Sequence, residues 1–78
     1  MNQQLIFNND FHYAADRNAI VFSCLVAGLK VCCVIPLVES VDAEQYLQQV
    51  KADAFTWEDK VELAIAADHY TTAGEIWL

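Results

Sequence analysis

Residues 19–35 read AIVFSCLVAGLKVCCVI, and this stretch decides the fold. Apolar and β-branched residues lie on both sides of Ala27 and Gly28, and glycine can adopt the positive φ angle that a tight hairpin turn needs. If Val26 pairs with Leu29, alternate residues of the two strands form one wholly apolar face. That face consists of Ile20, Phe22, Cys24, Val26, Leu29, Val31, Cys33 and Ile35. The stretch therefore predicts a β-hairpin with one core face and one mixed face.

The residues after Pro36 predict a helix, because apolar side chains recur from Ala43 onward at alternating spacings of four and three residues. The repeating positions are Leu47, Val50, Ala54, Trp57, Val61 and Ala64. Asp42 is placed to cap the first turn. We expect one long or kinked helix that ends near His69, and a break between Asp53 and Thr56 stays an open alternative.

Short strands are expected at QLIF (residues 4–7), at Phe11–Ala14 before the hairpin, and at the C-terminus, in EIWL. The predicted fold class is α+β: a two-layer domain in which an antiparallel, hairpin-based sheet of three to four strands packs against one long or kinked helix. At 78 residues, we expect the chain to form a single domain over residues 1–78.

The charge balance argues against several classes of partner. Eleven acidic and four basic residues give a net charge of −7, which repels nucleic acid and anionic lipid. The apolar run 19–38 contains Gly28, Lys30 and Pro36, so we interpret it as strands and not as a membrane span. The first ten residues lack the features of a secretory signal, and we expect a cytoplasmic protein with reduced thiols.

Three cysteines, Cys24, Cys32 and Cys33, lie within ten residues of one another. Adjacent residues of a strand point to opposite faces, so Cys32 and Cys33 cannot share one metal ion. Buried free cysteine behaves as a small apolar side chain. We expect three free thiols with Cys32, on the mixed face, as the reactive one, and we expect no metal and no cofactor.

Other polar residues offer thin evidence for chemistry. His12 lacks a partner at a fixed spacing, and Glu58 and Glu62 lie one turn apart on the helix, where a solvated face explains them. A small enzyme or ligand-binding subunit that uses Cys32, His12 or the Glu58/Glu62 pair is the alternative hypothesis.

The favoured hypothesis is a protein-interaction or self-associating module without catalysis. Phe55 and Leu63 lie on the side of the predicted helix that faces away from its main apolar stripe, and large exposed apolar groups in one line suggest a contact surface. The mixed face of the hairpin adds Val21, Leu25 and Val34 as interface candidates. We therefore expect a homodimer, or a complex with another protein.

The sequence resembles a family of small bacterial proteins, the domain-of-unknown-function family 1488. The similarity rests on LIF at 5–7, Tyr13, AIVF at 19–22, Gly28, VCCVI at 31–35, AEQYL at 43–47, Glu62 and GEIWL at 74–78. The resemblance implies a small α+β domain built from a hairpin sheet and a long helix, and it implies no activity.

Overall fold

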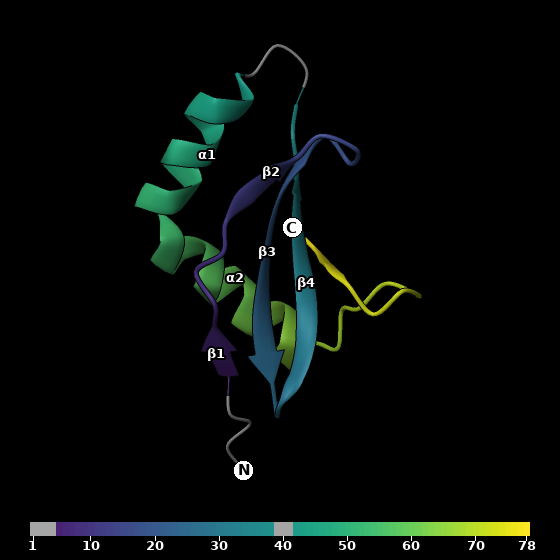
Figure 1. The fold of residues 1–78 in the computed structure, drawn as a ribbon. Coiled ribbons are helices and arrows are strands. Elements are labelled where there is room, and N and C mark those ends of the chain that lie inside the picture. Colours follow the sequence, from purple (N-terminus) through teal and green to yellow (C-terminus); the bar gives the residue numbers. More distant parts are fainter. Residues whose placement is uncertain (1–4, 39–41) are drawn as a thin grey trace.

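The computed structural model describes residues 5–38 and 42–78, and its secondary structure is that of an α+β protein (Figure 1). In chain order the elements are β1 (Leu5–Phe7), β2 (His12–Ala14), β3 (Ala19–Val26), β4 (Leu29–Pro36), α1 (Ala43–Ala52), α2 (Ala54–Ala66) and β5 (Ile76–Trp77). The strands form one sheet in the order β1-β3-β4-β5, and β2 also pairs with β3. The α+β class agrees with the prediction, but five strands replace the expected three to four.

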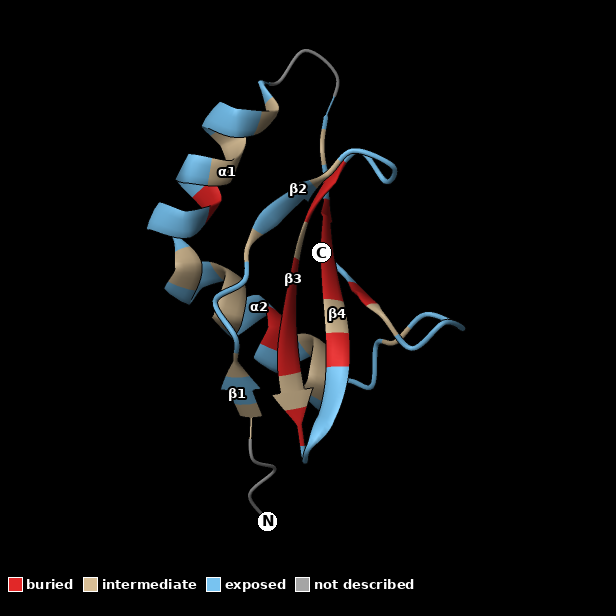
Figure 2. Cartoon of the chain, in the orientation of Figure 1, coloured by how far each residue is buried: buried red, intermediate tan, exposed pale blue. Residues whose placement is uncertain are grey.

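The β3–β4 hairpin has the predicted register, with Val26 opposite Leu29. Its two-residue turn places both Ala27 (φ 52°) and Gly28 (φ 86°) in the left-handed region. Seven of the eight predicted inner-face residues are buried, whereas Leu29 is 73 % exposed because it lies at the tip of the hairpin. Figure 2 shows the buried residues concentrated on these two strands.

The edge formed by β1 and β2 is interrupted between Phe7 and His12. Here the four residues 8–11 oppose only two residues of β3. The Asp10 carboxylate fills the gap by accepting hydrogen bonds from the backbone N–H of Ser23 (2.7 Å) and from its hydroxyl (2.6 Å). Asn8 also bridges this bulge, because its N–H donates to the Ser23 carbonyl (3.2 Å) and its side-chain amide donates to the Ser23 hydroxyl (2.9 Å), so the polar groups of the buried Ser23 are satisfied.

Two helices replace the single helix that we expected, and the break falls at Asp53. This residue leaves helical geometry (φ −103°, ψ 28°), while its N–H still contacts the carbonyls of Gln49 and Val50. Aspartate is a poor helix former, and here it makes no side-chain cap. The break redirects the chain so that Val50 of α1 and Val61 of α2 both reach the same core.

The sheet is mixed, and the expectation of a purely antiparallel sheet was wrong. β5 pairs in parallel with β4, with Cys33 opposite Ile76 and Val34 opposite Trp77. Parallel neighbours require a long crossover connection, and α1 and α2 supply it. The C-terminal strand therefore enters the sheet in the same direction as β4, and Ile76 is completely buried.

The core lies between the helices and the inner face of the sheet. Val50, Val61 and Ile76 join the inner side chains of β3 and β4 in one cluster, with Trp57 packed at its border. The rings of Phe11 and Phe22 also stack with their centres 4.6 Å apart. Both helices contact the same face of the sheet, so its other face has no layer over it in the described part of the chain.

We predict that replacement of Ala27 by asparagine stabilises the protein. An L-residue other than glycine or asparagine costs about 1–2 kcal/mol in the left-handed region, and Asn-Gly is the preferred sequence for this turn. Urea unfolding of Ala27→Asn should show a gain of roughly 1 kcal/mol. Gly28→Ala is the matched control and should lose stability by a similar amount; a destabilised Ala27→Asn would contradict the turn geometry.

We predict that Asp10→Asn destabilises the protein at neutral pH and has little effect in acid. Partial burial raises the pKa of Asp10, but the two hydrogen bonds from Ser23 outweigh it and lower the pKa below its ordinary value. The charged carboxylate therefore stabilises the fold at pH values above about 3.9, the pKa of aspartate in the unfolded chain. This stabilisation is lost as the pH falls through the lower pKa that Asp10 has in the folded protein. For this partly exposed carboxylate we expect a loss of about 1 kcal/mol at pH 7.

Urea unfolding of wild type and Asp10→Asn at pH 7 and in strong acid measures this difference. A loss of the same size at both pH values would show that the carboxylate charge does not stabilise the bulge.

Candidate functional site

The structure keeps the three chemical candidates from the sequence on different elements. His12 is exposed on β2, where its Nδ1 lies 2.9 Å from the backbone carbonyl of Asp10. Cys32 is half-buried in β4, and Glu58 and Glu62 lie on α2 in the opposite layer. Within residues 5–38 and 42–78, no three His, Cys, Asp or Glu side chains are grouped so that they could hold a metal ion. The candidates therefore form no common centre.

Cys24 and Cys33 touch each other in the core, with their sulfur atoms 4.0 Å apart. They are diagonal neighbours across the hairpin, because Cys24 lies opposite Val31 and Cys33 opposite Phe22. Both are free thiols without solvent exposure. The contact with Cys24 and burial raise the pKa of Cys33, so this thiol stays protonated and serves packing.

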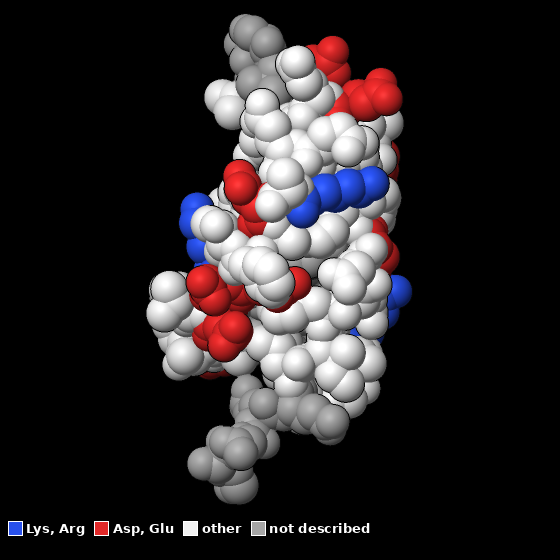
Figure 3. All heavy atoms as spheres, turned by 90° about the vertical axis from the view of Figure 1, so that its left-hand side faces the viewer, with Lys and Arg blue, Asp and Glu red and all other residues white. Residues whose placement is uncertain are grey.

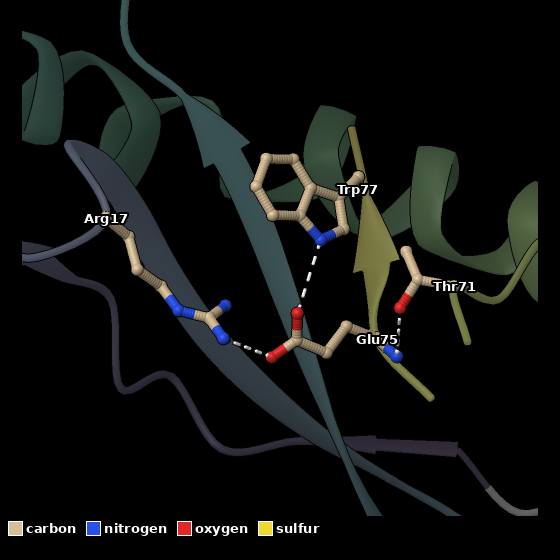
Figure 4. Close-up of polar contacts among 4 residues, drawn as sticks. All are labelled: Arg17, Thr71, Glu75 and Trp77. Carbon is tan, nitrogen blue, oxygen red and sulfur yellow. Dashed lines mark hydrogen bonds and ion pairs between the residues drawn. The ribbon is translucent and has the colours of Figure 1, made fainter. Parts of the chain in front are cut away.

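A polar chain crosses the face of the sheet that points away from the helices (Figure 4). The Arg17 guanidinium, from the β2–β3 turn, donates to the Glu75 carboxylate at 2.6 Å, and the Trp77 indole N–H donates to the other oxygen of Glu75 at 3.3 Å. The Thr71 hydroxyl accepts a hydrogen bond from the Glu75 N–H. Arg17 lowers the pKa of Glu75, so the pair stays ionised and fixes the start of β5 against the first hairpin.

We call this uncovered surface the open sheet face. Its accessible apolar and thiol side chains are Ile6, Val21, Leu25, Cys32 and Trp77. Ile6 is 46 % and Trp77 51 % exposed, and Ile6 lies directly opposite Leu25. Val34 had been a predicted contact residue of this face, but it is fully buried within the chain, with Trp77 as its cross-strand partner. Val34 therefore offers no area to a partner.

The opposite surface of the molecule is formed by α2. Phe55 is 83 % and Leu63 71 % exposed, so both predicted contact residues project into solvent. Phe55 stays exposed although the helix breaks just before it, at Asp53. Figure 3 shows the side of the molecule that lies on the left in Figure 1, and carboxylates gather in the lower part of that view.

Lys60, the one basic residue of α2, lies over the Trp57 ring and not beside Phe55 and Leu63. Its ammonium lies 4.6 Å from the centre of the Trp57 ring, on the flank of the helix that borders the core. Such a contact holds the positive charge near the indole. The exposed apolar side of α2 is therefore accompanied by carboxylates.

Sequence reasoning missed the ion pair of Arg17 with Glu75, the Asp10–Ser23 contact and the Cys24–Cys33 contact. The last could have been found, since the predicted register makes these cysteines diagonal neighbours, which lie within reach on one face. The ion pair joins residues 58 positions apart, and no local pattern indicates it.

No helix in the described ranges is both long and apolar enough to cross a membrane.

We predict one accessible thiol in the native protein. Cys32 is half-buried, whereas Cys24 and Cys33 are inaccessible, so a thiol reagent should modify one cysteine quickly and all three only after unfolding. Titration with a chromogenic disulfide reagent, with and without urea, measures this. Cys32→Ser should abolish the fast reaction. Rapid modification of three thiols in the native state would contradict the buried pair.

The comparisons with known proteins agree with the fold and assign no activity. The family model described as a protein of unknown function (DUF1488) matches residues 5–78. The crystal structure of a protein of unknown function from that family, from Shewanella loihica PV-4, has a TM-score of 0.86 at 23 % sequence identity and covers 100 % of this chain and 94 % of that chain. None of the curated proteins matches the sequence. Because the family model extends from β1 to the last residue, the chain belongs to the DUF1488 family, as its sequence motifs had suggested.

Proposed function

We propose that the protein is a non-catalytic, self-associating interaction module that forms a homodimer through the open sheet face. One observation carries the proposal: both helices pack on one side of the sheet, while Ile6, Leu25 and Trp77 remain accessible on the other. Exposed apolar patches of this kind mark contact sites, and aromatic side chains such as Trp77 are enriched in interfaces. A two-fold pairing of identical surfaces is the commonest closed arrangement.

The distribution of charge supports this face over the helix face. In residues 5–38, which contribute most of the sheet, Asp10 and Asp16 are balanced by Arg17 and Lys30. Glu75, which pairs with Arg17 on the open sheet face, adds one acid, so residues 5–38 together with Glu75 carry three acids against two bases. A nearly neutral, apolar surface can meet its own copy without bringing like charges together.

The size of the molecule is compatible with such a dimer. The structure extends 42 × 26 × 18 Å, so one broad side can provide the roughly 800 Å² per partner that a standard interface buries. A domain of this length buries only about 60–65 % of the surface that its unfolded chain exposes, and an oligomer interface would increase the buried fraction. Self-association would therefore also stabilise the fold.

The proposal includes the cytoplasm as the compartment. Two thiols 4.0 Å apart stay reduced most easily there, where disulfides are rare. The net charge of −7 also favours protein partners over nucleic acid or anionic membranes.

We predict that Ile6→Glu and Leu25→Glu each dissociate the dimer. An unpaired carboxylate buried in an interface costs about 3 kcal/mol or more, which raises the Kd by roughly a hundredfold. Sedimentation equilibrium from low to high micromolar concentration should show a dimer for wild type and a monomer for both variants. Added salt should tighten the wild-type dimer, because it screens the repulsion between two acidic chains.

Leu63→Glu is the matched control, since it adds the same charge on the opposite side of the molecule and should leave the dimer intact. Circular dichroism verifies that each variant is folded. A wild-type monomer at high concentration and high salt, or dissociation by Leu63→Glu alone, would refute dimerisation through the open sheet face.

A further inference from the structure

We propose that the exposed side of α2 is a second docking surface, which binds a cationic amphipathic segment of another protein. Positions 55, 59, 62 and 66 follow one another at spacings of four, three and four, so Phe55, Asp59, Glu62 and Ala66 form one line along the helix. Leu63 lies one turn beyond Asp59 on the adjacent line. These five residues define the α2 stripe, in which two carboxylates lie between two large apolar groups.

A hollow beside the stripe supplies a place for an anchoring side chain. It has a volume of about 200 Å³ and is lined by Leu5, Val26, Glu62, Ile65 and Ala66. Glu62 also borders a shallower depression with Asp59 and Leu63. The hollow is smaller than the roughly 300–1,000 Å³ of typical small-molecule pockets, and a side chain that fills such a recess is the usual anchor of a protein interface.

The charge of the α2 stripe determines the chemistry of the occupant. Asp59 and Glu62 are exposed within it, and Lys60 is held against Trp57 outside it. Residues 42–66 as a whole carry six acids against two lysines. A second copy would bring Asp59 and Glu62 against carboxylates of the same kind, which opposes pairing. A segment with lysine or arginine beside apolar side chains would satisfy both the carboxylates and the exposed Phe55 and Leu63.

The proposed docking is independent of the dimer. The α2 stripe lies in the helix layer, and the open sheet face lies on the other side of the sheet. A dimer formed through the sheet would leave both stripes accessible, and a monomer would leave one. The peptide experiment below can therefore fail or succeed separately from the oligomer measurement.

The test uses three fluorescent model peptides of equal length: an amphipathic Leu/Lys helix, its Leu/Glu counterpart, and an oligolysine without apolar residues. Fluorescence anisotropy at physiological salt should show micromolar binding of the Leu/Lys peptide and at least tenfold weaker binding of the oligolysine. The Leu/Glu peptide should not bind. Wild-type protein that binds the oligolysine as tightly as the Leu/Lys peptide would show only general charge attraction and would overturn the proposal, as would failure to bind the Leu/Lys peptide.

Two double variants localise the binding. Phe55→Ser/Leu63→Ser keeps the net charge, and Asp59→Asn/Glu62→Gln keeps the apolar groups. Each double variant should bind the Leu/Lys peptide with an affinity lower by roughly tenfold or more. Asp16→Asn/Glu44→Gln removes the same amount of charge at exposed positions outside the stripe and should change binding less than about twofold. Equal weakening by this control, or unchanged binding by Phe55→Ser/Leu63→Ser, would overturn the assignment to α2.

Discussion

The apolar inner face of the β3–β4 hairpin is the constraint on which the rest of the structure depends. Its buried side chains come from two adjacent strands in one register, and β1, α1, α2 and β5 each bring at least one apolar group to them. Val50 comes from α1, Val61 from α2, Ile76 from β5 and Phe11 from the bulge before β2. Both helices pack on this one inner face, so no helix is left to cover the other face of the sheet in the described part of the chain, and that other face is exposed.

Local periodicity explains which parts of the fold could be predicted. The hairpin alternates with a period of two over both strands, so its register and inner face followed from Gly28 and the pattern. The helix break at Asp53 was an open alternative, and the pattern could not decide it, because Val50 and Val61 are eleven residues apart, about three turns of a continuous helix. The period thus runs through Asp53 unchanged. The direction of β5 was also hidden, since two paired residues carry no periodic signal and depend on where the crossover returns.

The candidate surfaces were predictable to the extent that they are local. The exposure of Phe55 and Leu63 follows from their phase on the helix, and it survives the break because both lie within α2. The burial of Val34 could not be predicted, since it depends on pairing with Trp77, far along the chain. The same holds for the ion pair of Arg17 and Glu75, which makes a charged part of the open sheet face neutral. Long-range pairing thus decides which of the candidate residues can meet a partner.

The two layers differ in charge as well as in position, and this difference is the basis of the two proposed contact surfaces. Residues 5–38 and Glu75 carry three acids against two bases, whereas residues 42–66 of the helix half carry six acids against two lysines and also expose Phe55 and Leu63. Like charges oppose the pairing of identical surfaces, so a net acidic surface favours unlike partners and a neutral one tolerates its own copy. A chain with one central sheet and helices on one side can therefore present a surface for itself and a surface for another protein. The broken helix adds to this, because α1 and α2 both reach the core while the outer side of α2 stays free.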